Sequence, residues 1–413
     1  AVRRPPSAVR RPPSAVSRPP SAVIVWASVS PVPDRDFIVS TLSRLVRIDS
    51  VNPSLAPGAG GEEEIAAFIA KTLGAIGLES STFESAPGRA TAVGVLRGTG
   101  GGRSLMLNGH ADTVGVEGMA DPFSGEVRDG RVYGRGSHDM KGSLAACLGA
   151  AKMLADARVR LRGDLIVAAV ADEEYGSMGT AELLTRCRPD GAIVTEPTNL
   201  QVCLAHKGYA WIEVETIGKA AHGSRFTEGV DAVMRMGRFL GELDRLERAL
   251  REGPAHPLVG PPSLHAATIE GGTGPSTYAA SCRLTIERRT VPGETIAGVI
   301  GQIQAIVDRL SAAEPGFTAT ARLVFSREPF EVSPGAAIVR SVTGAAGQVL
   351  GRTPALVGDT PWMDAALLAG AGVDTVVFGP TGAGEHSAVE WVDVESVVGT
   401  AGVLARAAMD YCA

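Results

Sequence analysis

The stretch SLMLNGHADTVGVEG, residues 104–118, runs an apolar segment directly into polar side chains. Residues 105–107 have the character of a buried strand, and His110 and Asp112 follow closely behind them. A titratable group at the end of a buried strand needs a hydrogen-bond partner, an opposite charge or a metal, because burying it alone costs several kcal/mol. The stretch therefore indicates a functional site at a strand end.

The same arrangement recurs later in the chain. Three further apolar runs lead to acids or a histidine: LIVAAVA (165–171) leads to Asp172, Glu173 and Glu174, AIVT (192–195) to Glu196, and TVVF (375–378) through a glycine-rich loop to His386. Strand-like and helix-like segments alternate from about Asp34 onward, which predicts an α/β fold with a mostly parallel sheet. The carboxyl ends of parallel strands meet at one edge of the sheet, so we expect these groups to converge.

A fifth group, Asp139, lies in GRGSHDMKGSLAA (134–146), just before an alanine-rich, helix-like segment. Alone, Asp139 could be a helix N-cap, and strand-end histidines or paired glutamates could be structural or solvated. The repeated coincidence favours a metal site. Two histidines and three carboxylates suit zinc, with cobalt or manganese as alternatives, and one shared carboxylate lets two ions lie roughly 3.5–4 Å apart. Asp112 would then fix the tautomer of His110.

Composition narrows the class of protein. A length of 413 residues predicts more than one core, and 45% hydrophobic with 20% charged residues is typical of a globular protein. No apolar run is long enough to span a membrane. The net charge of -6, without a basic stripe, excludes nucleic acid as the expected partner. The five scattered cysteines predict no disulfide framework, and hence a cytoplasmic protein.

The N-terminus has a repeated sequence. Residues 1–21 read AVRRPPS, AVRRPPS and AVSRPPS, which predicts a low-complexity tail over residues 1–33. A signal peptide is the alternative, because the apolar AVIVWASV (22–29) follows arginines, but prolines crowd the charged region and the apolar run is short. A translated upstream segment is another explanation.

Five stretches resemble, in order and spacing, the signatures of the dinuclear zinc amidohydrolases, the family that includes acetylornithine deacetylase, succinyl-diaminopimelate desuccinylase, aminoacylase and glutamate carboxypeptidase. They are NGHADTV (108–114), GRGSHDMKG (134–142), DEEYGSMGT (172–180), VTEPT (194–198) and FGPTGAGEHSAVEWV (378–392). The resemblance runs from about residue 35 to the C-terminus. It implies that His110, Asp139 and Glu196 bind one ion and Asp139, Glu174 and His386 the other, with Glu173 as the general base.

The resemblance also implies a smaller α+β lid and dimerisation domain inserted into the catalytic domain. Residues 207–326 are the candidate, between catalytic parts at 34–206 and 327–413. Within it, GKAAHGS (218–224) resembles the segment that carries the lid histidine, here His222. Relatives with a lid of this size look like homodimers, so we expect His222 to stabilise the oxyanion in the partner's site.

One departure from the family pattern leaves the substrate open. Residues 276–279 (STYA) stand where related enzymes commonly have Asn-x-Val/Ile-Pro. The Asp-x-Arg-x-x-Pro pattern appears as residues 287–292 (ERRTVP), which places Arg289 at the position that binds a substrate carboxylate. A guanidinium suits bidentate capture of a carboxylate. The adjacent Arg288 is interpreted as a solvated strand edge.

These features together predict an amidohydrolase that cleaves small N-acyl amino acids. A water activated by metal would attack the carbonyl, and Glu173 would take its proton and pass it to the leaving amine. Glu at position 196 resembles the deacylase and carboxypeptidase branch; a carboxypeptidase, aminopeptidase or dipeptidase acting on peptides is the alternative. A non-catalytic metal-binding homologue is a third reading, but such a protein does not need Glu173 as an unligated base.

Overall fold

The largest sheet has nine strands in the order β1-β2-β6-β3-β7-β15-β8-β13, with β14 paired to β8. The strands are β1 Glu79–Ala86, β2 Arg89–Leu96, β3 Leu105–His110, β6 Leu165–Val170, β7 Gly191–Val194, β8 Val202–His206, β13 Phe330–Glu331, β14 Leu356–Asp359 and β15 Asp374–Val377. The central neighbours β6, β3, β7 and β15 are parallel, whereas β1, β2 and β13 pair antiparallel. The α/β prediction is confirmed, and the sheet is mixed, with its parallel part at the centre.

The computed structural model describes residues 31–413, and residues 32–413 form one compact unit. The predicted tail at residues 1–33 therefore lies outside the described residues except for its last three. None of the helices between residues 31 and 413 is long and apolar enough to cross a bilayer.

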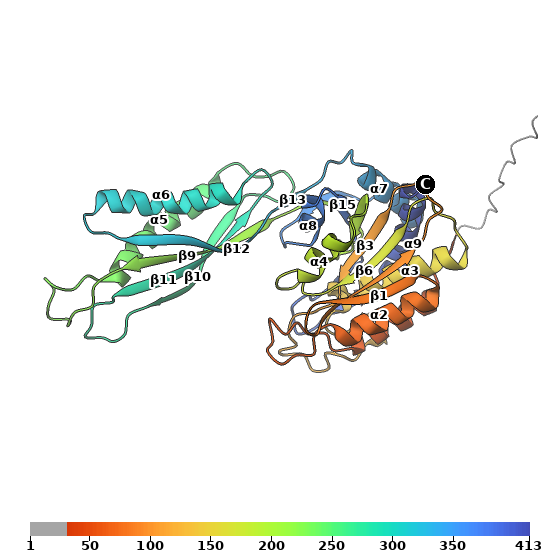
Figure 1. Cartoon of the computed structure of the whole chain (residues 1–413), viewed down its shortest axis with the longest axis horizontal. Coiled ribbons are helices and arrows are strands. Elements are labelled where there is room, and N and C mark those ends of the chain that lie inside the picture. The colour runs from red at the N-terminus through yellow and green to blue at the C-terminus, as the bar shows by residue number, and fades with distance from the viewer. Residues whose placement is uncertain (1–30) are drawn as a thin grey trace, which may run out of the picture. The chain divides into compact units, whose positions relative to one another are not determined.

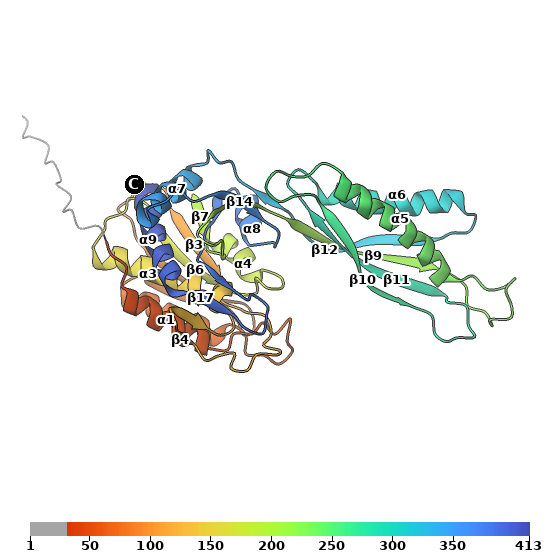
Figure 2. The same ribbon diagram turned by 180° about the vertical axis from the view of Figure 1, so that it is seen from behind.

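Helices cover both faces of the large sheet (Figures 1 and 2). Leu105 and Leu107 of β3 join the core formed with α1, α2, α3, α7 and α9, whereas Met106 joins the opposite core with α4 and α8. These helices are α1 Arg35–Arg47, α2 Glu63–Ile76, α3 Gly142–Asp156, α4 Met178–Arg186, α7 Ala337–Leu350, α8 Ala365–Gly370 and α9 Val394–Tyr411. Successive side chains of a strand point to opposite faces, so a sheet covered on both faces reads as continuous apolar runs.

A small antiparallel sheet has the strand order β16-β17-β5-β4. Along the chain, β4 and β5 follow β3, and β16 and β17 follow β15. Its strands are β4 Glu126–Arg128, β5 Arg131–Tyr133, β16 Gly382–Ala383 and β17 Trp391–Asp393. The short kinked turn η1 (Ser137–Lys141) follows β5, and the loop with His386 joins β16 to β17. Pairing of β17 with β5 therefore brings together two segments that are far apart in the sequence.

A third sheet, of order β10-β11-β9-β12, is antiparallel and packs one face against α5 and α6 (Figure 2). These elements are β9 Gly208–Ile217, α5 Ala232–Glu252, β10 Ser263–Gly271, β11 Ser281–Thr290, α6 Ile296–Ala313 and β12 Ala319–Arg327. The chain leaves the large sheet at β8 and returns at β13, where Phe330 pairs with His206, so this lid module is an insertion. The exact domain bounds at 207 and 326 stay a prediction; they fall beside the ends of β8 and β12.

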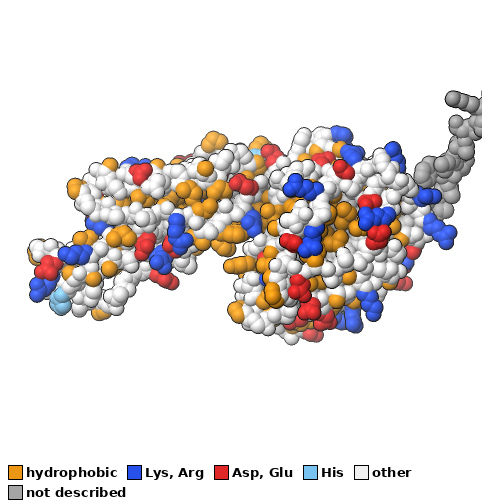
Figure 3. All heavy atoms as spheres, in the orientation of Figure 1, with side chains coloured by type: hydrophobic (Ala, Val, Ile, Leu, Met, Phe, Trp, Pro, Cys, Tyr) orange, Lys and Arg blue, Asp and Glu red, His pale blue; other side chains and the backbone are white. Residues whose placement is uncertain are grey.

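The lid module exposes apolar side chains on its two edge strands. Ile269 on β10 is 53% exposed and Val324 on β12 is 48% exposed, and hydrophobic side chains are visible over this part of the surface (Figure 3).

One interpretation from the sequence is wrong: Arg288 of β11 is fully buried rather than solvated. Its guanidinium pairs with Glu294 at 2.5 Å, because the alternation of β11 turns this side chain inward.

Candidate metal centre

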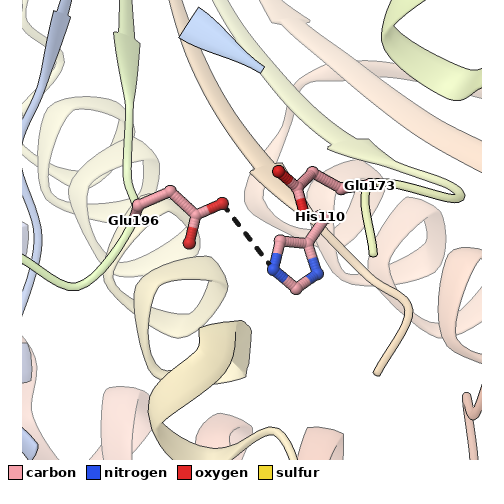
Figure 4. Close-up of side chains that lie close together, drawn as sticks. All are labelled: His110, Glu173 and Glu196. Carbon is pink, nitrogen blue, oxygen red and sulfur yellow. Dashed lines mark ion pairs between the residues drawn. The ribbon is translucent and has the colours of Figure 1, made fainter. Parts of the chain in front are cut away.

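The carboxyl ends of the parallel strands bring acids and a histidine into one cluster, as the sequence predicts. His110 ends β3, Glu173 follows β6 and Glu196 follows β7, and their side chains point toward one another (Figure 4). One ligand atom from each of the three lies within 4.8 Å of the other two, and the same holds for His110, Asp139 and Glu174. His110 therefore belongs to two overlapping groups that could each hold a cation.

Asp139 lies between the two predicted histidines. Its Oδ1 is 2.9 Å from Nε2 of His110, and its Oδ2 is 3.4 Å from Nε2 of His386. The same Nε2 of His386 lies 3.2 Å from Oε2 of Glu174, and Nε2 of His110 lies 3.7 Å from Oε1 of Glu196. All five predicted ligands thus lie in one continuous set of contacts, with Asp139 at its centre.

The electrostatics of the cluster follow from crowding acids in a buried place. Burial raises the pKa of Glu173 well above its ordinary value, and the nearby Glu196 carboxylate raises it further. Burial also raises the pKa of Glu196 and of Glu174. Hydrogen bonds to Asp139 and Glu174 raise the pKa of His386 to about 10. Negative charge is in excess here, and a cation would relieve it.

The donor set fits a divalent metal. His110 is almost completely buried, and Oε1 of Glu174 is buried with no hydrogen-bond partner among the described residues. Buried carboxylates without partners are costly, and imidazole with carboxylate oxygens are ligands that zinc and similar ions accept. Glu173 lies as close to His110 and Glu196 as a metal ligand would. The distances by themselves therefore fit Glu173 both as a ligand and as an unligated base.

Asp112 connects the end of β3 to the turn after β6. Nδ1 of His110 is 2.8 Å from the backbone oxygen of Asp112, and 3.7 Å from its carboxylate. A carbonyl oxygen only accepts, so Nδ1 must donate, which leaves Nε2 free to face Asp139. The Asp112 carboxylate itself accepts from the backbone NH groups of Glu173 and Glu174, at 3.1 and 3.2 Å. The hydrogen bond that orients the His110 ring is therefore made by the backbone oxygen of Asp112 and not by its carboxylate.

Glu390 is a supporting residue that the sequence reasoning missed. Its buried carboxylate accepts hydrogen bonds from the backbone NH groups of Gly136, His138 and Asp139, and from the guanidinium of Arg135 at 2.7 Å. These contacts hold the turn that presents Asp139. The signal was present, because Glu390 lies inside the quoted stretch 378–392.

The sequence reasoning also missed Asn52 and Asp364. Neither residue follows an apolar strand, so no pattern in the sequence marks it. Asn52 donates from Nδ2 to Asp112 at 2.8 Å and to Asp172 at 3.1 Å. Asp364 accepts from Oγ1 of Thr180 at 2.5 Å, and burial raises its pKa to about 6. Only the folded chain brings these side chains beside the cluster.

Arg289 and His222 lie in different surroundings. Arg289 lines a cavity of about 690 Å³ together with Glu173, Glu174 and His386, and its Nε donates to Glu287 at 2.6 Å. His222 is exposed in a loop of the lid module, with Nδ1 2.8 Å from Oγ of Ser224, and it is not among the residues that line this cavity. Within one chain, the structure brings Arg289 but not His222 to the cluster.

Comparison with known proteins identifies the family. The description Peptidase family M20/M25/M40 matches residues 106–410. The chain belongs to this family. Acetylornithine deacetylase of Myxococcus xanthus is 33% identical over 393 residues, which cover 90% of this chain and 97% of that enzyme. N-formyl-4-amino-5-aminomethyl-2-methylpyrimidine deformylase of Bacillus subtilis is 31% identical over 375 residues, 83% of this chain and 88% of that enzyme.

Solved structures of the family share the fold. Aminopeptidase PepT of Bacillus cereus superimposes with a TM-score of 0.75 at 19% identity, covering 92% of this chain and 100% of that chain. A family metallo-carboxypeptidase of Sulfolobus solfataricus gives a TM-score of 0.73 at 18% identity, covering 91% and 99%. Members of this family typically bind divalent metals, and this chain is a metallo-hydrolase of linear amides.

Proposed function

We propose that this protein hydrolyses the amide bond of N-acyl amino acids, with Glu173 as the general base. One observation carries the proposal: Glu173 is a half-buried carboxylate of raised pKa that lines the same cavity as Glu174, His386 and Arg289. A general base works best when its pKa lies near the working pH, because it must both accept and release a proton. A raised pKa brings a carboxylate closer to that range.

The proposed ligands are His110, Asp139 and Glu196 for one ion, and Asp139, Glu174 and His386 for the other. The two short contacts of Asp139, one to each histidine, support a shared role for its carboxylate. Zinc is the proposed metal, with cobalt or manganese as alternatives, because the set mixes imidazole and carboxylate ligands. When bound, such ions lower the pKa of a water and polarise a carbonyl.

Glu173, Asp112 and Arg289 have separate roles in the proposed reaction. Glu173 accepts the proton of the attacking water and donates it to the leaving amine, so one carboxylate serves both halves of the reaction. Asp112 holds the backbone of Glu173 and Glu174 through its two carboxylate contacts. Arg289 lines the same cavity, where its guanidinium can bind the α-carboxylate of the amino acid.

The relatives support a deacylase over a peptidase. Both named relatives above 30% identity remove an acyl group from nitrogen, according to their names. The peptidases PepT and the Sulfolobus carboxypeptidase are below 20% identical and share the fold. The acyl group and the amino acid are specificity features that a family fold alone does not determine.

We also propose that the active enzyme is a homodimer formed through the lid module, in which His222 completes the partner's site. The exposure of His222, away from the residues that line the cavity of its own chain, supports a role in another subunit. The two uncovered edge strands, β10 and β12, offer backbone groups that a twofold partner can pair.

A substrate panel tests the proposed function. N-acetyl and N-succinyl amino acids should be hydrolysed by the zinc- or cobalt-loaded enzyme, whereas dipeptides with a free amine should be poor substrates. Glu173→Ala should lower kcat by roughly 10²–10⁴-fold with metal content unchanged. Glu182→Ala, which removes a surface ion pair with Arg186 on α4, is the matched control and should retain activity. Preference for free dipeptides would replace the deacylase by an aminopeptidase, and equal rates for wild type and Glu173→Ala would exclude the mechanism.

A further inference from the structure

One wall of the cavity is aromatic, and strand alternation is the reason. Along β9 the side chains of Ala210 and Ile212 are buried against the helices of the lid module, whereas Tyr209 and Trp211 are only half-buried. Neighbouring residues of a strand point to opposite faces. Tyr209 and Trp211 therefore stand on the face away from α5 and α6, and both line the cavity that contains Glu173.

A third ring completes this wall from the large-sheet side. Trp362, in the loop after β14, lines the same cavity and meets Tyr209 edge to face, with ring centroids 6.3 Å apart. The ring centroids of Tyr209 and Trp211 lie 5.5 Å apart, and Phe325 of β12, the cross-strand partner of Trp211, contacts both rings. Aromatic side chains at these separations make favourable offset or edge contacts, so the three rings form one connected surface.

The polar groups of the two tryptophans are already satisfied by the protein. Nε1 of Trp211 donates to Glu287 at 3.2 Å, and Nε1 of Trp362 donates to the backbone oxygen of Glu328 at 3.1 Å. A ligand in the cavity therefore meets ring surface rather than free indole donors. Such a surface favours flat apolar groups, which gain both area burial and ring contacts.

Glu173 and Glu174 line the cavity as part of the proposed metal centre, but the charges beside the aromatic rings disfavour a cationic side chain there. Lys207 and Arg289 both line the cavity, and Glu287, the one further acid among its described lining residues, is paired with Arg289 at 2.6 Å. An aromatic wall can also attract a cation. Here the guanidinium of Arg289 already lies 5.2 Å from the ring centroid of Tyr209, so a second cation would meet like charge.

We infer that this cavity selects substrates whose amino acid carries an aromatic side chain, which packs on Tyr209, Trp211 and Trp362 while its carboxylate is held by the adjacent cations. The inference rests on the proposed deacylase function and adds to it a substrate class. It separates this chain from its acetylornithine-cleaving relative, because ornithine carries a side-chain ammonium. The leaving amino acid, rather than the acyl group, is the half of the substrate that is recognised here.

Hydrolysis of three substrates by the zinc-loaded enzyme tests the inference. N-acetyl-L-phenylalanine should exceed N-acetyl-L-leucine in kcat/KM by roughly 3- to 10-fold, the contribution of one aromatic contact, and should exceed Nα-acetyl-L-ornithine by more. Trp211→Leu and Trp362→Leu keep an apolar surface but remove the ring. Each should lower kcat/KM for the phenylalanine substrate by roughly 3- to 10-fold more than for the leucine substrate.

Trp391→Leu is the matched control. Trp391 of β17 stacks under Arg131 of β5, with 3.7 Å between the guanidinium and the ring centroid, and is not among the residues that line the cavity. Its kcat/KM ratio for phenylalanine over leucine substrates should equal that of wild type. A thermal unfolding curve for each variant shows that it folds, and Trp211→Phe and Trp362→Phe, which restore a ring, should recover the selectivity.

Binding of the free products is a readout that does not depend on turnover. L-phenylalanine should quench tryptophan fluorescence of the zinc-loaded protein and bind at least 10-fold more tightly than L-ornithine. A higher kcat/KM for the ornithine substrate, or equal losses for both substrates in the tryptophan variants, would overturn the inference. Tight phenylalanine binding without hydrolysis of any acyl amino acid would support the aromatic cavity and remove the proposed function instead.

Discussion

The backbone NH of Glu173 donates a hydrogen bond of 3.1 Å to the Asp112 carboxylate. The residue two positions after His110 thus fixes the turn that carries the proposed base. Asp112→Asn keeps the side-chain shape but removes the charge that these NH groups face. We expect metal affinity or kcat to fall roughly 10- to 100-fold, as for other groups that orient metal ligands. Metal titration and steady-state rates measure the change.

Asp156→Asn is the control for this substitution, since the exposed carboxylate of Asp156 pairs with Lys152 at the end of α3. It should leave metal affinity and kcat as in wild type. A fully active Asp112→Asn enzyme with normal metal affinity would show that the backbone contacts to the Asp112 carboxylate do not position the site.

The central place of Asp139 predicts two metal ions per chain in the fully loaded enzyme. Elemental analysis after metal saturation should give a ratio near two, and anomalous scattering should place both ions beside Asp139. Asp139→Ala should reduce the ratio, because its two oxygens face different histidines. A single ion in a site without contact to Asp139 would contradict the prediction.

Arg289→Ala should raise KM and lower kcat/KM for substrates with an α-carboxylate, since a charge-assisted contact is lost. A loss of roughly 10- to 100-fold corresponds to the typical 1.5–3 kcal/mol of a hydrogen bond to a charged group. The matching α-carboxamide substrate should be nearly unaffected. Arg283→Ala on the same strand is the control, because Arg283 pairs with Glu213 and Glu215 at the exposed surface. Equal losses for both substrates would make Arg289 structural.

Subunit mixing tests the predicted role of His222. His222→Ala and Glu173→Ala enzymes, each inactive alone, should regain activity when mixed under conditions that exchange subunits. In a mixed dimer, one site combines an intact Glu173 with an intact His222 of the other chain. His265→Ala, an exposed histidine on β10, should be active without mixing. If the mixture stays inactive although subunit exchange is demonstrated independently, His222 acts within its own chain or takes no part in the reaction.

His206 should make folding stability depend on pH. Burial lowers the pKa of His206 to about 4, and its Nε2 has no hydrogen-bond partner among the described residues. The neutral ring is favoured in the folded state, so this stability is fully present above about pH 6.5 and is lost as the pH falls toward 4. The loss at pH 5 should be on the order of 2 kcal/mol.

Urea unfolding at pH 7.5 and pH 5 measures this dependence. His206→Phe, which packs against Phe330 and Trp362 without a titrating group, should lose less stability between the two pH values than wild type. His265→Gln is the control and should follow wild type. Identical pH dependence for wild type and His206→Phe would contradict the prediction.

The sequence by itself determined which strand ends carry chemistry. A strand covered on both faces must be apolar throughout, so LIVAAVA and its counterparts stand out, and acids or histidines behind them have few structural reasons to be there. His110, Glu173 and Glu196 could be named because β3, β6 and β7 are parallel neighbours whose ends meet. The α/β class followed from the same local periodicity.

The tertiary structure alone decided what surrounds those groups. The contacts of Glu390 with the Asp139 turn and of Asn52 with Asp112 join segments that no local pattern connects. Arg288 was misjudged because strand alternation shows that successive side chains face opposite ways, but not which way is inward. The cavity with Trp211 and Trp362 exists only where two distant segments meet, because the free energy of burying apolar surface depends on partners in space rather than on neighbours in sequence.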